Sequence, residues 1–182
     1  MNNEQQGLLK RQFYILKWFV YHLTYYRILS QRYEEHNLKN EFWTLTIDAH
    51  LLRASVQWCM VFGSDTTNPT HWKRLFTKAS EESHFRQELF TATCFDQDTW
   101  QEYWESMTGF RNKYAVHEFE FTKPVPDFAP ALTVVHYYDN WMRNFTCPGT
   151  LQECPLISFE QSLRTSVVPL LEKVLKVTTE HC

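Results

Sequence analysis

An arginine and a histidine six positions apart, Arg111 and His117, are the residues best placed to carry chemistry. Arginine keeps a permanent positive charge, and histidine changes its charge near neutral pH. On a helix expected from about Asp98 to His117, Arg111 falls about 20° from Trp100, in the middle of an apolar stripe. A buried guanidinium requires a partner. Arg111 therefore either forms a structural ion pair or reaches solvent along the helix edge, or its stripe faces a cleft or a second subunit.

The same helix separates the two residues by about 120° and about 9 Å along its axis. A long arginine side chain covers part of that gap. Fraying of the helix at His117, or donation of the pair across a dimer, would cover the rest. Asn112 and Lys113 fall on the opposite, polar face with Glu102 and Glu105.

The segment Gly109 to His117, with sequence GFRNKYAVH, resembles the R-x(4–6)-H signature of the HEPN superfamily. In that family a polar residue often follows the arginine, as Asn112 does here. The upstream segments 58–65 and 70–73 are similar to uncharacterised bacterial HEPN-like proteins related to abortive-infection families. The resemblance covers about Phe42 to His117, and it implies a small α-helical bundle with the motif late in a long helix.

The resemblance also implies a function. Active HEPN proteins are metal-independent endoribonucleases that form symmetric dimers with a composite site. Arg111 would hold the scissile phosphate, His117 would transfer protons, and Asn112 would orient one of them. The expected partners are RNA as substrate, a second copy of the chain and an antitoxin protein, in toxin–antitoxin or phage defence. No metal or cofactor is expected. Some family toxins carry a modified tyrosine two residues after the histidine, where this chain has Phe119.

Contact with RNA would have to come from local cations, because the formal net charge is −3. Lys73 and Arg74 precede the motif helix, and Lys113 lies within it. We predict that these three residues contact nucleic acid; the alternative is an ordinary solvated surface.

Two other functional hypotheses remain open. The chain is either a catalytically silent HEPN-like module that binds a protein or nucleic acid, or a plain bundle in which Arg111 is structural. The positions of Arg111 and His117 distinguish these hypotheses from an active enzyme, because catalysis requires both side chains to open onto one groove. A silent protein allows Glu105 or Glu118 to neutralise Arg111.

Other histidines and cysteines favour structural roles. His71 follows Asp65 and precedes Trp72; a catalytic or metal-binding pair is possible in principle, but a histidine packed beside a tryptophan at a helix start is favoured. His22, His50, His84 and His136 fall on separate helices, with no ligand-spaced pair among them. For the cysteines, including Cys147 and Cys154, free thiols are favoured over a bridge or a shared metal.

Apolar periodicity predicts helices throughout. We expect helices over about 5–36, 41–62, 81–93, 98–117, 131–145 and 158–178, plus a short one capped by Thr70. Gly63 is expected to stop the second helix, Asp98 and Gln101 to form a capping box, and Pro169 to kink or break the last helix. Residues 118–130 read as a loop in which Phe119 and Phe121 allow a short strand.

Composition fits this architecture. The chain has 182 residues, 43% of them hydrophobic and only 4 of them glycine. This favours one all-α domain over residues 1–182 rather than a sandwich or barrel, and the resemblance implies that the domain is HEPN-like; Gly-rich phosphate loops are absent. The apolar segment 13–29 is interrupted by Lys17, His22 and Arg27, so we expect no membrane span. With no signal peptide visible, we expect a cytoplasmic protein.

Overall fold

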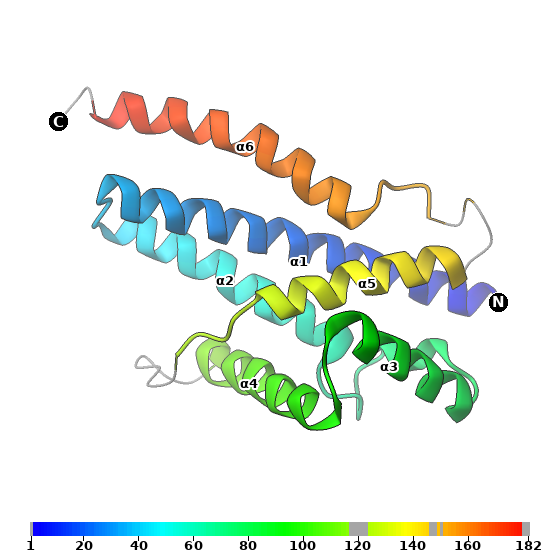
Figure 1. Ribbon diagram of the computed structural model, residues 1–182. Coiled ribbons are helices and arrows are strands. Elements are labelled where there is room, and N and C mark those ends of the chain that lie inside the picture. The colour runs from blue at the N-terminus through cyan, green and yellow to red at the C-terminus, as the bar shows by residue number, and fades with distance from the viewer. Residues whose placement is uncertain (1, 117–123, 146–148, 150, 180–182) are drawn as a thin grey trace.

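The computed structural model describes residues 2–116, 124–145, 149 and 151–179. Within these ranges the chain forms six α-helices and one short 3₁₀ helix, and no strand (Figure 1). The all-α prediction is therefore confirmed. The elements are α1 (Asn3–His36), α2 (Glu41–Phe62), η1 (Trp72–Leu75), α3 (Ala79–Thr93), α4 (Gln97–Val116), α5 (Ala129–Phe145) and α6 (Leu156–Thr179).

Helix α1 is the central element, and it packs against α2, α5 and α6 (Figure 1). Its N-terminus is fixed by a capping box, in which Asn2 and Gln5 satisfy each other's backbone N–H groups. It ends at Asn37, whose backbone adopts the left-handed conformation. Because α2 runs back along α1, residues far apart in the sequence form one long seam.

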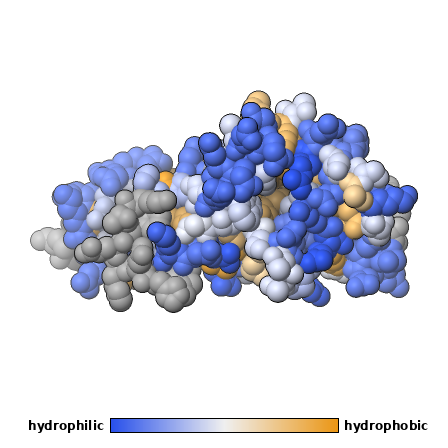
Figure 2. All heavy atoms as spheres, turned by 90° about the horizontal axis from the view of Figure 1, so that it is seen from below, coloured by the Kyte–Doolittle hydropathy of each residue, from blue (hydrophilic) through white to orange (hydrophobic). Residues whose placement is uncertain are grey.

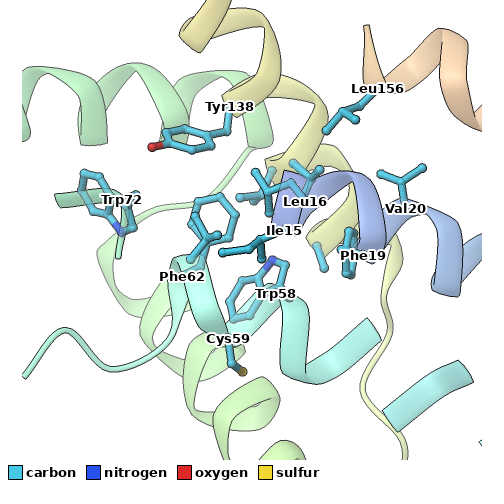
Figure 3. Packing of buried hydrophobic residues seen from close by; sticks show 14 of the residues in the cluster. Ile15, Leu16, Phe19, Val20, Trp58, Cys59, Phe62, Trp72, Tyr138 and Leu156 are labelled. Atoms are coloured by element: carbon cyan, nitrogen blue, oxygen red, sulfur yellow. The ribbon is translucent and has the colours of Figure 1, made fainter. Parts of the chain in front are cut away.

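The main core joins large aromatic and aliphatic side chains from α1, α2 and α5 (Figure 3). Trp58 and Phe62 of α2 are fully buried, and their rings lie 5.4 Å apart. Phe62 also contacts Tyr138 of α5 edge-on, at 5.4 Å between ring centroids. A second, smaller cluster attaches α6 to the far end of α1 and α2 through Ile28, Leu29, Ile47, Val167, Leu171 and Leu175.

A buried glutamine ties three elements together inside the main core. The Gln12 side-chain amide donates to the carbonyl oxygens of Thr70 and His71, both at 3.1 Å. Its oxygen accepts from the Tyr138 hydroxyl at 2.9 Å. Every polar atom of this buried side chain therefore has a partner, which fixes the η1 segment against α1 and α5.

Helix α2 has the predicted bounds, and Gly63 follows its last residue. The Gly63 N–H donates to the Cys59 carbonyl at 3.0 Å. A Cβ at this position would lie 2.5 Å from that oxygen, so only glycine fits without a shift of the backbone.

Two predicted caps are wrong by one or two residues. The capping box of α4 joins Asp96 and Thr99 rather than Asp98 and Gln101. The short helix after the loop is capped by His71, not by Thr70. At η1 the capping residue His71 has the extended backbone that an N-cap requires.

Helix α6 continues through Pro169, so the predicted break does not occur. The possible strand at Phe119 and Phe121 lies outside the described residues. Among the described helices, none combines the length and the hydrophobicity that crossing a membrane requires.

Candidate functional site

Helix α4 carries the candidate motif. Hydrogen bonds from Trp104 and Tyr103 join this helix to the end of α2 and to the start of α5. The Trp104 indole donates to the Phe62 carbonyl at 2.8 Å, which fixes α4 against the end of α2. The Tyr103 hydroxyl donates to the Asp127 carbonyl at 2.8 Å and accepts from the Ala131 N–H at 3.0 Å. Burial, with the Asp48 carboxylate of α2 as a further cause, raises the pKa of Tyr114, one turn past Arg111, to about 12.

Arg111 is half-buried on this rigid helix, and its Nε is buried with no hydrogen-bond partner among the described residues. Its charge acts on the buried Cys59 thiol of α2. Burial raises the pKa of that thiol to about 12, and the Arg111 charge opposes the shift. The guanidinium therefore lies toward α2, as its place in the apolar stripe predicts.

Neither carboxylate suggested as a neutralising partner is seen to pair with Arg111. Glu105 accepts from Gln101 at 2.8 Å, and the described part of the chain contains no ion pair between Glu105 and Arg111. Glu118 lies outside the described residues. So does His117, and the distance between the two predicted catalytic groups is therefore untested.

Asn112 and Lys113 are exposed, as expected for the polar face of α4. Lys113 lines a shallow pocket of about 350 Å³ together with Glu102, Glu105 and Phe110 of the same helix. Pro124 and Pro126, just before α5, form its other wall. Two carboxylates thus share this pocket with one cation.

Lys73 and Arg74 lie elsewhere and already have partners. The Lys73 ammonium lies 2.7 Å from Asp65 and 3.7 Å from Glu82, and Arg74 donates to the Asp65 carbonyl at 2.7 Å. Lys73 lines a second pocket, of about 240 Å³, beside Gln101 in the first half of α4. Twelve residues separate Gln101 from Lys113, about 18 Å along the helix axis. The structure does not bring the three predicted RNA-binding cations together.

The surface formed by α3 and α4 is mostly hydrophilic (Figure 2). Helices α3 and α4 together contain six carboxylates and three cations. These two helices therefore have a negative charge balance, which disfavours sequence-independent attraction of RNA to the surface they form.

His71 is a structural residue. Its ring lies beside Trp72 at 5.7 Å, and its Nδ1 accepts from the Lys73 N–H at 3.3 Å. Burial lowers the pKa of His71 to about 4, although Asp65 and a hydrogen bond to the Gly63 backbone oppose the shift. The predicted packing against Trp72 is confirmed, and the imidazole is neutral at pH 7.

The structure also contains a histidine pair that the spacing of residues in the sequence does not predict. The Nδ1 atoms of His22 in α1 and His50 in α2 lie 3.0 Å apart across the helix seam. Burial lowers the pKa of both, that of His22 to about 4 with further contributions from His50 and Arg53. Spacing within one helix cannot reveal such a pair, because the contact depends on how two helices align.

The described residues contain no group of three or more metal-ligating side chains. Cys59, Cys94 and Cys154 are free thiols, whereas Cys147 lies outside the described residues.

Comparison of the chain with protein-family models, curated proteins and solved structures gave no match in any of the three. Membership of the HEPN superfamily therefore stays a prediction that rests on the motif and on the helical architecture that carries it.

Proposed function

We propose that the chain is a HEPN-type, metal-independent endoribonuclease that acts as a homodimer in toxin or phage-defence systems. The observation that carries the proposal is the state of Arg111. A half-buried guanidinium with an unpartnered Nε is costly, and a bound anion would satisfy it with charge-assisted hydrogen bonds. The RNA phosphate is the anion that this proposal supplies.

In the proposed reaction, His117 takes the proton of an RNA 2′-hydroxyl, and the resulting oxygen attacks the adjacent phosphorus. The bond from phosphorus to the 5′-oxygen breaks, and the protonated imidazole of His117 returns the proton to that oxygen. The products are a 2′,3′-cyclic phosphate and a 5′-hydroxyl, so no water molecule is consumed. Arg111 offsets the charge that grows on the phosphate, and Asn112 orients the phosphate or the imidazole.

Dimerisation provides the second half of the site in this proposal. The motif ends α4, so two copies that meet at this end would place both Arg111 side chains near one axis. An antitoxin protein would act by covering that groove. Cytoplasmic location belongs to the same proposal, because RNA is the substrate.

Cleavage of RNA in EDTA tests the proposal. Wild type should yield cyclic-phosphate ends detectable by mass spectrometry. Arg111→Ala and His117→Ala should each lower the cleavage rate by at least about 100-fold, the usual loss for a phosphate-binding or proton-transferring group. Lys173→Ala, an exposed change on α6, is the matched control. Cleavage that survives both motif substitutions would contradict the assigned site.

A second candidate function has its own observation. Glu102 and Glu105 lie in the pocket with Lys113, and Asp65 and Glu82 neutralise Lys73. This pattern favours a silent module that binds a basic protein segment on the α4 face. Absence of cleavage by wild type across several classes of RNA would support it, with binding of a lysine-rich peptide lost in Glu102→Gln/Glu105→Gln.

A further inference from the structure

Helix α1 has an uneven distribution of charge. Residues 5–33 contain five cations and no carboxylate, in a chain whose formal net charge is −3. Two of these cations are paired: Lys17 with Glu153 at 2.8 Å, and Arg32 with Glu35 and Glu172. Lys10 and Arg11 are exposed. The part of α1 between residues 5 and 33 is therefore basic, although the chain as a whole is acidic.

The same helix presents large aromatic side chains to solvent near its middle. Trp18 is 53% exposed and Tyr14 is 49% exposed. Trp18 belongs to a cluster of rings that spans the seam between α1 and α2, which we call the seam ring cluster: Trp18, Tyr21, His22, Tyr25 and His50.

Contacts within the seam ring cluster hold Trp18 in one orientation. Its ring stacks on His22 at 5.7 Å and meets Tyr21 edge-on at 5.3 Å. His22 in turn contacts His50, which stacks on Tyr25 at 5.1 Å. Neighbouring rings already hold the Trp18 ring in place, and part of it is exposed. It therefore loses little conformational freedom when another flat group stacks on it.

Two guanidinium groups flank this exposed ring. Arg11 lies two helical turns before Trp18 on the same face of α1, and Arg53 lies on α2, close enough to His22 to lower its pKa further. Both are exposed, and neither forms an ion pair within the ranges that the structure describes. Glu153, which contacts this face of α1, already accepts from Tyr14 and Lys17.

We infer that the exposed face of α1 around Trp18 binds single-stranded nucleic acid. A base would stack on Trp18, and Arg11 and Arg53 would contact backbone phosphates on either side. Every base has a flat π face, so this binding tolerates many sequences. The site is separate from the Arg111 motif, and the inference stands whether or not the chain cleaves RNA.

Charge favours this occupant over a second copy of the chain. Two copies joined through this face by a two-fold axis would bring the unpaired Arg11 and Arg53 toward the same cations, with Glu4, two helical turns before Arg11, as the unpaired carboxylate of this face of α1. A polynucleotide supplies the missing negative charge at regular intervals. Single strands also leave their bases open for stacking, whereas a duplex does not.

Fluorescence anisotropy with a labelled oligothymidylate of about 12 nucleotides, in EDTA, tests the inference. This probe lacks 2′-hydroxyls, so its binding is independent of the proposed cleavage. Trp18→Ala should weaken binding about tenfold, and Trp18→Phe should retain most of the affinity. Arg11→Gln and Arg53→Gln should each reduce the slope of log Kd against log salt by about 0.7.

The matched controls are Leu170→Ala and Lys173→Gln on α6, where Leu170 is 61% exposed. Neither should change Kd. Three results would overturn the inference: unchanged binding by Trp18→Ala, equally tight binding of a duplex of the same length, or equal loss in the α6 controls. A dimer in sedimentation that Trp18→Ala dissociates, without an effect on oligonucleotide binding, would assign the face to self-association instead.

Discussion

At the level of single residues, the buried polar side chains fall into two groups. Gln12 and Asp139 are almost completely buried, and each is hydrogen-bonded to neighbouring elements. Arg111 is half-buried and keeps an unpartnered Nε among the described residues, as do the ring nitrogens Trp58 Nε1 and His136 Nε2; of these three groups, the guanidinium carries the permanent charge. Satisfied groups stabilise the fold, whereas an unsatisfied cation costs free energy that binding can recover. This contrast is the reason to look for function at Arg111 and not at His71.

His71 should make the protein less stable in mild acid. Its pKa in the folded protein is about 4, below the ordinary value of 6.5, so the unfolded chain binds more protons between these two pH values. Stability is therefore complete above about pH 6.5 and falls as the pH decreases toward 4. The His71 contribution to the free energy of unfolding should drop by at most about 2 kcal/mol between pH 7 and pH 5.

Urea unfolding of His71→Asn at both pH values measures this contribution. Asparagine keeps a cap for η1 but does not titrate, so the variant should lose less stability than wild type between pH 7 and pH 5. His22, His50 and His136 also have lowered pKa values, so they should account for the pH dependence of stability that remains in the variant. An unchanged pH dependence would show that His71 is not the titrating group.

At the level of elements, α6 is attached differently from the rest. Asp139 of α5 accepts from the Leu156 N–H at 2.8 Å, and the Arg143 side chain donates to the carbonyls of Glu153 and Cys154. These contacts fix the start of α6. Its far half is held by the smaller apolar cluster with Ile28 and Ile47.

Replacing Pro169 with alanine should stabilise α6. Proline lacks the N–H that would bond to the Thr165 carbonyl, and its ring crowds that group. Pro169 is exposed, so the change leaves no cavity. We expect Pro169→Ala to raise the free energy of unfolding by about 1 to 2 kcal/mol, less than the full helical penalty because proline also restricts the unfolded chain.

Urea unfolding gives the measurement, with Ser162→Ala at another exposed α6 position expected to stay within about 0.5 kcal/mol. A loss of stability in Pro169→Ala would mean that a bend at Pro169 is needed for α6 to contact Ile28 and Ile47.

The sequence predicts the helices well because 3.6-residue periodicity is local. The bounds of α2 and the mid-stripe place of Arg111 follow from spacing alone. The His22–His50 pair, the Gln12 network and the pairing of Lys73 with Asp65 do not, because each depends on how separate elements align. The prediction that Lys73 binds RNA considered only the lysine charge. It did not include Asp65, which the loop before η1 places beside Lys73.

At the level of the whole molecule, charge is distributed unequally between two faces. Every charged residue between positions 5 and 33 of α1 is a lysine or an arginine. Helices α3 and α4, in contrast, have twice as many carboxylates as cations. An RNA strand that contacts Lys113 on the polar face of α4 must therefore come close to Glu102 and Glu105, which line the same pocket. These two carboxylates should repel the substrate.

Glu102→Gln/Glu105→Gln should accordingly raise kcat/KM for RNA cleavage several-fold at low salt, since two like charges are removed from the approach to the phosphate site. The gain should disappear near 1 M salt, where the Debye length is about 3 Å. Glu88→Gln on α3 is the control, because it changes net charge away from this pocket. An equal gain in the control would show that net charge alone matters. No gain in the double variant would mean that the strand does not cross the polar face of α4.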